Sequence, residues 1–192
     1  MPRCKVCQTP TTQRFGLTYA CGFDHAIEYA QRNVRKKQQA AQRKAEREEK
    51  RKHREQKEKV KTRTEWYDQL QALVNQYVVK VRDANEWCCT CGTRNNVKYD
   101  AGHCFTRKAR PELRFELTNI HKQCSVQCNQ HGSGMRAEYF ELIKLKYGDD
   151  HFEWLNGPHP SLKNQYPEIS DIKADIVRYR KLLRDNGVTP AT

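Results

Sequence analysis

A chain of 192 residues has room for one domain or two small ones, which excludes a large multidomain enzyme. Only 36% of the residues are hydrophobic and 31% are charged, so the composition predicts a small core with an extended solvated part. The net charge of +13 predicts a polyanionic partner, for which nucleic acid is a commoner candidate than a membrane surface.

The cysteine content indicates metal-binding sites. The N-terminal residues do not resemble a signal peptide, and no apolar run approaches the length of a transmembrane helix. These features predict a cytoplasmic protein with no membrane partner. In that reducing compartment, the nine cysteines favour metal sites over disulfides.

Residues 1–30 contain the first set of metal-ligand residue types. A Cys-x-x-Cys turn is followed by Cys-x-x-x-His, and zinc binds four such donors in a tetrahedron. The spacing predicts a small structural zinc knuckle, and the alternative is a loose tail with unliganded thiols. The predicted ligands are Cys4, Cys7, Cys21 and His25.

Residues 31–63 form a basic segment without Gly or Pro, which predicts a charged helix. From residue 32 onward it holds 15 Lys and Arg against 5 Glu, an excess of +10 out of the total of +13. Too few apolar residues are present for a coiled-coil seam. A solvated spacer and an arm that follows DNA phosphates are both compatible with this pattern.

Residues 64–83 have the apolar spacing of an amphipathic helix, with Thr64 as a weak start signal. The stripe requires a partner, either the region that follows in the chain or the same helix of a second subunit. Its members are Trp66, Leu70, Leu73, Val74, Tyr77, Val78 and Val81.

Residues 84–150 contain a second cysteine set, with a Cys-x-x-Cys pair and a Cys-x-x-x-Cys pair. Four thiolates predict a zinc site that is structural, because a closed Cys4 site has no open position for substrate. We expect a strand over 97–103, a turn over 106–111, a second strand over 113–117 and a helix over 135–147, which gives an α+β class. The predicted ligands are Cys88, Cys91, Cys124 and Cys128.

Residues 151–192 complete the chain. The span 151–167 is rich in Pro, Gly and Asn and predicts a loop. A last helix follows, with Ser170 or Asp171 as its cap and Gly187 at its end.

The central region also carries residue types suited to phosphodiester hydrolysis. A His at a strand end can accept a proton from water at neutral pH, and carboxylate or amide oxygens can bind Mg²⁺. Lone His and Asn residues are more often turn or capping residues, so chemistry alone leaves both interpretations open. The candidates are Asp100, His103, Asn119, Asn129 and His131.

Several motifs together resemble the phage NinG/Rap recombination nucleases, a branch of the HNH (His-Me finger) superfamily. They are the sequence DAGH at 100–103, Arg114-Phe115, NIHKQC at 119–124, and CNQH at 128–131 followed by Ser133-Gly134. The resemblance covers nearly the whole chain. It implies a small zinc-stabilised ββα-metal finger with flanking helices that cuts branched DNA, such as Holliday junctions and D-loops, in the cytoplasm of the phage host.

The resemblance also implies residue roles. His103 matches the general base, Asn119 the Asn that fixes the loop and the His orientation, and Asn129 a ligand of a catalytic Mg²⁺ or Mn²⁺. Asp100 and His131 are further candidate ligands. The chain departs from many HNH enzymes in having Gly102 where they have Asp, and in the longer spacing of its second cysteine pair.

The hypothesis is therefore a metal-dependent endonuclease for branched DNA. Four basic residues of the finger are expected to contact phosphates, namely Arg107, Lys108, Arg110 and Arg114. The rival is a zinc-stabilised DNA-binding recombination accessory protein without catalysis. An RNA-binding zinc protein is disfavoured because no aromatic stacking motif is visible. A homodimer is suggested by the two nicks that a symmetric junction requires.

Overall fold

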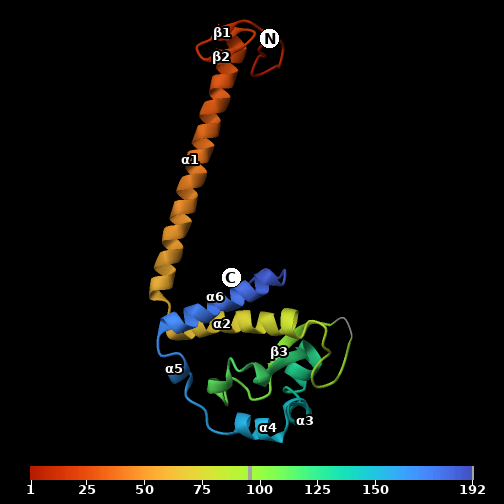
Figure 1. Cartoon of the computed structure of the whole chain (residues 1–192). Helices are drawn as coiled ribbons and strands as arrows, with labels where there is room; N and C mark the ends of the chain where they lie inside the picture. Colours follow the sequence, from red (N-terminus) through yellow and green to blue (C-terminus); the bar gives the residue numbers. More distant parts are fainter. Residues whose placement is uncertain (95–96, 192) are drawn as a thin grey trace. The chain divides into compact units, whose positions relative to one another are not determined.

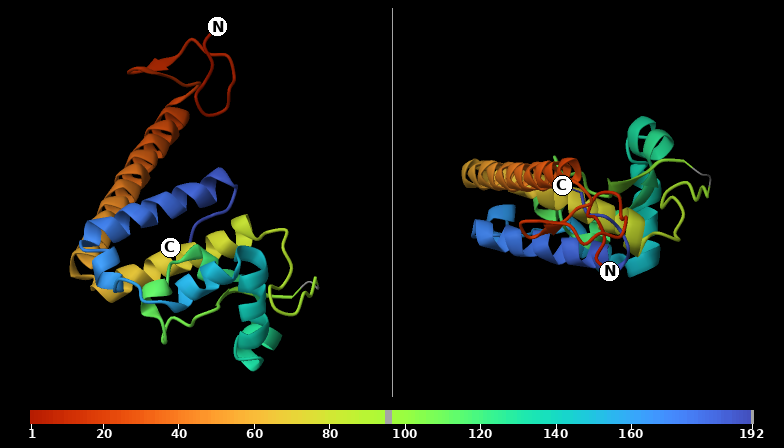
Figure 2. Two further views of the ribbon diagram at one scale, coloured as in Figure 1. Left: turned by 60° about the horizontal axis from the view of Figure 1, so that its bottom comes forward. Right: turned by 90° about the horizontal axis from the view of Figure 1, so that it is seen from above.

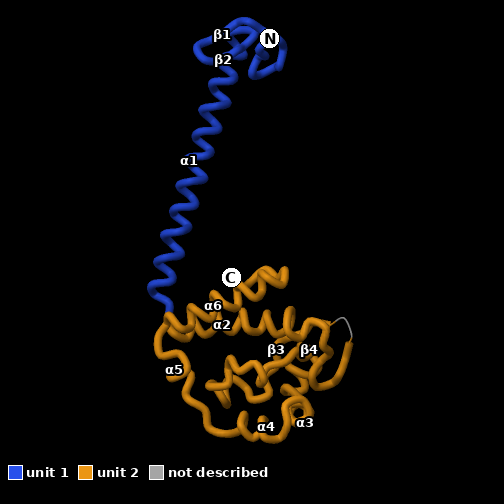
Figure 3. The backbone as a smooth tube through the Cα atoms, in the orientation of Figure 1, with its two compact units in different colours: residues 1–61 blue, residues 62–192 orange. Residues whose placement is uncertain are grey.

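The structure is a computed structural model that describes residues 1–94 and 97–191. The chain divides into two compact units, residues 1–61 and 62–192 (Figure 3). Both contain helices and a small antiparallel two-stranded sheet, which confirms the α+β class. In the described part of the chain, no helix combines the length and the apolar character needed to cross a membrane.

The first unit consists of a small knuckle and one long helix. Strands β1 (Arg14–Phe15) and β2 (Thr18–Tyr19) pair in antiparallel fashion around Gly16, whose φ of 59° suits glycine. Helix α1 (Phe23–Val60) follows without a break (Figure 1). It begins eight residues earlier than the basic segment at 31–63, because nothing between Phe23 and that segment interrupts helical hydrogen bonding. None of its residues is buried.

The second unit begins with helix α2 (Arg63–Tyr77), which continues into a π-helical turn, η1 (Val78–Arg82). The predicted start at Thr64 is wrong by two residues. Thr62 is the N-cap, since its side chain accepts a hydrogen bond from the backbone N–H of Glu65, whose carboxylate accepts one from the Thr62 N–H.

The apolar stripe of α2 is buried within the chain. It packs against helix α6 (Ile169–Asp185), which runs beside α2 in Figures 1 and 2, and against Ile120. The cap of α6 is Glu168 and not Ser170 or Asp171, because the Asp171 carboxylate accepts from the backbone N–H of Glu168 as the third residue of a capping box.

The predicted first strand is present as β3 (Tyr99–His103), but its partner is β4 (Ile120–Cys124). The strand expected over 113–117 is wrong: Pro111–Leu113 and Leu117–Asn119 form the 3-10 turns η2 and η3. The β4 segment was missed because it is buried on both faces, so polar residues such as His121 and Gln123 replace the usual alternation.

Helix α3 (Arg136–Tyr147) ends at Gly148, as predicted. The loop expected over 151–167 is wrong at its start, since residues 151–156 belong to α4 (Asp149–Asn156), and α5 (Leu162–Gln165) is a further helical turn. The apolar residues Phe152 and Leu155 pack α4 against α3, which outweighs the high Pro and Gly content that begins at Gly157.

Candidate functional site: two metal clusters and a cavity at the end of β3

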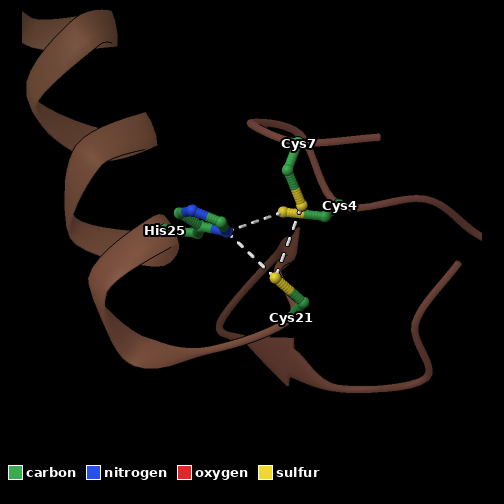
Figure 4. Close-up of side chains that lie close together, drawn as sticks. All are labelled: Cys4, Cys7, Cys21 and His25. Carbon is green, nitrogen blue, oxygen red and sulfur yellow. Dashed lines mark hydrogen bonds between the residues drawn. The ribbon is translucent and has the colours of Figure 1, made fainter. Parts of the chain in front are cut away.

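The four N-terminal ligand residues converge at the start of α1 (Figure 4). Their ligand atoms all lie within 4.8 Å of one another. The Sγ of Cys21 lies 2.9 Å from Nδ1 of His25, and 3.5 Å from Sγ of Cys7. The backbone N–H of Cys7 lowers the pKa of the Cys4 thiol to about 6, which favours the thiolate that zinc binds. Three sulfurs and one imidazole nitrogen fit tetrahedral zinc.

The second cluster joins the segment before β3 to the end of β4. The sulfurs of Cys88, Cys91, Cys124 and Cys128 all lie within 4.8 Å of one another. Burial raises the pKa of the Cys88 thiol, but N–H groups of Cys91 and Cys124, with the Thr90 hydroxyl, outweigh it and lower the pKa to about 6. Four cysteine sulfurs fit a closed zinc site with no position left for substrate.

The longer spacing of the second cysteine pair has a structural counterpart. Cys128 lies in the π-helical turn η4 (Ser125–His131), whose wider ring takes up one residue more than an α-helical turn. Asn129, the next residue, consequently lines the same cavity as His103. The extra residue therefore does not separate these two positions.

A cavity of about 300 Å³ lies where β3 ends. We call it the His103 cavity. It is formed by the end of β3, the following loop, η4, the N-terminus of α3 and one residue of α2. Its polar lining consists of Asn75, His103, Thr106, Arg107, Asn129, Ser133 and Arg136.

The His103 ring interacts with two backbone groups. Nε2 lies 3.3 Å from the backbone carbonyl oxygen of Arg114, and the backbone of Ala101 also hydrogen-bonds to the ring. In the tautomer in which Nε2 carries the hydrogen and donates to Arg114, Nδ1 has the lone pair that can accept a proton. Burial lowers the pKa of His103 to about 4, and the charges of Arg107 and Arg114 act in the same direction. The imidazole is therefore neutral at pH 7.

Asn119 lies outside the cavity lining and is fully buried. Its Oδ1 accepts from the backbone N–H of Phe105 at 2.7 Å. Its Nδ2 donates to the backbone carbonyls of Phe105 and Leu113 at 3.1 and 3.2 Å. These bonds fix the loop that follows His103, so Asn119 is placed as a positioning residue.

Asp100 is linked to the cavity through Asn129. The Asn129 Nδ2 lies 3.4 Å from Oδ2 of Asp100, and the Ser125 hydroxyl donates to the same oxygen. The second carboxylate oxygen of Asp100 lies 3.9 Å from Nζ of Lys98, and Asp100 does not line the cavity. The Asn129 Oδ1 and the Asp100 carboxylate are oxygen donors, a type that suits Mg²⁺. His131 is exposed and does not line the cavity, so the structure does not bring this predicted ligand to the site.

The glycine at position 102 is explained by packing. A Cβ atom there would lie 2.4 Å from Oε1 and 3.0 Å from Cβ of Gln123. The Gln123 side chain is fully buried, and its Nε2 donates to Thr90 and to the Gly134 carbonyl. The Asp that many HNH enzymes carry before the His therefore has no room in this chain.

The four predicted phosphate contacts divide into two pairs. Arg107 lines the cavity and Lys108 is exposed, so both are accessible. Arg110 instead pairs with Glu112 and donates to the carbonyls at the end of α4, and Arg114 donates to Gln71 and Asp68. These internal bonds argue against phosphate contacts by Arg110 and Arg114.

Two lining residues were missed by the sequence reasoning. Asn75 comes from α2, 28 positions before His103, and no local pattern distinguishes it from other polar residues of that helix. Arg136 is the first residue of α3. Its position two residues after the Ser133-Gly134 motif was the one available signal.

The family model described as NinG, the bacteriophage lambda NinG protein, matches residues 1–186. A "Protein ninG" of Escherichia phage 933W is 36% identical over 190 residues, which covers 95% of this chain and 92% of that protein. The protein of the same name from Salmonella phage P22 is 37% identical over 127 residues, or 66% of this chain and 62% of that protein. The one from Escherichia phage lambda is 36% identical over 127 residues, covering 66% and 61%. No solved structure matches the chain. The chain belongs to the NinG family of bacteriophage proteins.

Proposed function

We propose that this NinG-family chain is a metal-dependent endonuclease of the HNH type that cuts branched DNA, such as Holliday junctions and D-loops. The observation that carries the proposal is the position of the His103 imidazole at the end of β3, in contact with the Arg114 carbonyl and lining one cavity with Asn129 and Arg107. Order along the chain supports it, because β3, β4 and α3 follow one another as strand, strand and helix.

Six residues in or near the cavity have a chemical task in this proposal. Nδ1 of His103 takes the proton of a water molecule as its oxygen attacks phosphorus, and the bond from phosphorus to the leaving oxygen breaks. Asn129 and Asp100 would hold Mg²⁺ or Mn²⁺, which when bound polarises the phosphate and stabilises the leaving oxygen. Arg107, Lys108 and Arg136 contact phosphate oxygens and position the strand.

Both cysteine clusters hold structural zinc in this proposal, and the basic α1 adds sequence-independent attraction to the DNA backbone. Metal analysis of the purified protein should find two zinc ions per chain. The variant Cys88→Ser should retain one. A wild-type protein with no zinc in either cluster would remove the scaffold role assigned here.

The rival is a DNA-binding accessory protein in which His103 and Asn129 are structural. Both interpretations are compatible with the lack, among the described residues, of a third cluster of three or more His, Cys, Asp or Glu ligands. Mg²⁺ retains several waters and needs only one or two protein oxygens, so this lack does not weigh against the nuclease.

The deciding experiment compares a labelled synthetic four-way junction with a linear duplex of the same sequence, in Mg²⁺ and in Mn²⁺. His103→Ala is the test variant, and His53→Ala, an exposed histidine of α1, is the matched control. Cuts near the branch that disappear only in a His103→Ala protein that still binds the junction support the nuclease. Tight binding by the wild type with no cuts in either metal overturns it and leaves the rival.

A further inference from the structure

A chain of hydrogen bonds leads from the surface of α2 to the His103 cavity. Arg114 donates through Nη2 to Asp68, and through Nε to Oε1 of Gln71 at 3.0 Å. Gln71 is almost fully buried and donates through Nε2 to Oδ1 of Asn75 at 2.7 Å. Asn75 lines the cavity together with Arg107 of the loop after β3. We call this chain the Arg114–Gln71–Asn75 relay.

The relay fixes the direction of both amides. A guanidinium group can only donate, so the Gln71 atom that faces Arg114 must be the oxygen. The Gln71 nitrogen then faces Asn75, and the Asn75 atom that meets it must be the oxygen. The group that Asn75 can offer to the cavity is therefore its Nδ2 amide, a hydrogen-bond donor.

The same arginine also orients the imidazole. The backbone carbonyl of Arg114 accepts from His103 Nε2, while its side chain sets the orientation of Asn75 through Gln71. One residue thus contacts the His103 ring through its backbone and orients the Asn75 amide through its side chain. This arrangement suits a phosphate between the two side chains. The phosphate oxygens need a hydrogen-bond donor, and the water that attacks phosphorus needs a proton acceptor.

We propose that Asn75, held by Gln71 and Arg114, donates its Nδ2 hydrogen to a non-bridging oxygen of the phosphate that is cut. This inference rests on the proposed function and adds a substrate contact from outside the strand–strand–helix finger. In this arrangement Gln71 is a positioning residue, since it acts on substrate only through Asn75.

The first variant is Asn75→Asp. A carboxylate still accepts from Gln71 Nε2, so the relay is preserved, but an anion replaces the donor and repels phosphate. We expect the single-turnover cleavage rate of the four-way junction to fall about 10²-fold, as for loss of one donor to a developing oxyanion. Asn164→Asp, the same change at an exposed position of α5 outside the cavity, should cut at the wild-type rate.

The second variant, Gln71→Glu, changes the orientation of Asn75 without replacing it. One oxygen of the introduced carboxylate accepts from Arg114, and its other oxygen requires a donor. Asn75 must therefore rotate its Nδ2 toward that carboxylate and present Oδ1 to the cavity. We expect a loss of at least ~10-fold in the cleavage rate with little change in Tm.

A binding measurement separates this inference from the proposed nuclease activity. The side-chain amide resonance of Asn75, assigned by its loss in Asn75→Asp, should shift when a short DNA duplex is added without Mg²⁺. Equal cleavage rates for wild type and both variants overturn the inference and leave the nuclease intact. A wild type that never cuts, but whose Asn75 amide shifts, overturns the nuclease and retains the phosphate contact. No cleavage and no shift overturn both.

Discussion

Replacing Asn119 by Ala tests whether this residue acts through the loop after His103. The change leaves the buried N–H and C=O of Phe105 without their partner, whereas the C=O of Leu113 still accepts from the backbone N–H of Glu116. A buried group without a hydrogen bond costs about 1–3 kcal/mol, and carbonyls cost less than N–H groups. We therefore expect a loss of about 2–4 kcal/mol, a large part of the ~5–15 kcal/mol of a typical domain.

The variant Asn119→Asp sharpens this test. One carboxylate oxygen can accept from Phe105 N–H, but the other would face two carbonyl oxygens in a fully buried place. The folded protein then favours the protonated acid, which raises its pKa above the unfolded value of about 3.9. The folded state binds more protons, so stability relative to wild type should fall by up to ~1.4 kcal/mol for each pH unit of increase.

The assay is urea unfolding of the zinc-loaded proteins between pH 5.5 and 8, followed by fluorescence, with junction cleavage measured on the same samples. At pH 7, Asn119→Asp should be less stable than Asn119→Ala. Thr189→Ala, a substitution of an exposed C-terminal residue, serves as the control. A fully stable Asn119→Ala protein that no longer cuts DNA would refute the reasoning, because it would place Asn119 in contact with substrate.

The remaining predictions concern single side chains around the cavity. Gly102→Ala should destabilise the protein by about 1–3 kcal/mol in thermal unfolding, and Gln123→Ala in the same chain should recover part of that loss. Equal stability of wild type and Gly102→Ala would contradict the clash between a Cβ at position 102 and the Gln123 side chain. Arg107→Ala should weaken DNA binding at unchanged Tm, and should reduce by about one the slope of the logarithm of the binding constant against the logarithm of the salt concentration. Arg110→Ala should lower Tm with little change in that slope, and the reverse pattern would reassign both residues. The imidazole of His103 should titrate near pH 4 by NMR, so the stability of the protein should fall as the pH drops from about 6.5 toward 4, and His103→Ala should remove that loss. A His103 pKa at or above 6.5 would refute the burial of its ring.

Local spacing was sufficient for some features of the fold. Both ligand sets that the cysteine patterns predicted are gathered in the structure, because a Cys-x-x-Cys turn brings its two sulfurs together whatever surrounds it. The apolar stripe of α2 and the end of α3 at Gly148 also follow from periodicity and from one glycine. For the stripe and for Gly148 the signal lies within a few residues of the feature.

Other features depend on contacts between distant residues. Strand β4 carries no alternation because His121 and Gln123 are buried and bonded to Tyr139, Thr90 and Gly134. The bond between Arg114 and Gln71 joins residues 43 positions apart, so no local pattern could remove Arg114 from the predicted phosphate contacts. Burial of a polar side chain is decided by its partners, and single-sequence patterns do not contain them.

The capping box at Thr62 limits how far local unfolding of α1 can spread along the chain. Helix α1 buries no residue, so its hydrogen bonds depend on helix propensity and on exposed pairs such as Arg51 with Glu48 and Glu55. Helix α2 begins with its own cap and packs against α6, so fraying of α1 stops at Lys61. Amide hydrogen exchange should therefore be fast along residues 26–60 and slow from Leu70 to Val78, with the change in protection at the cap.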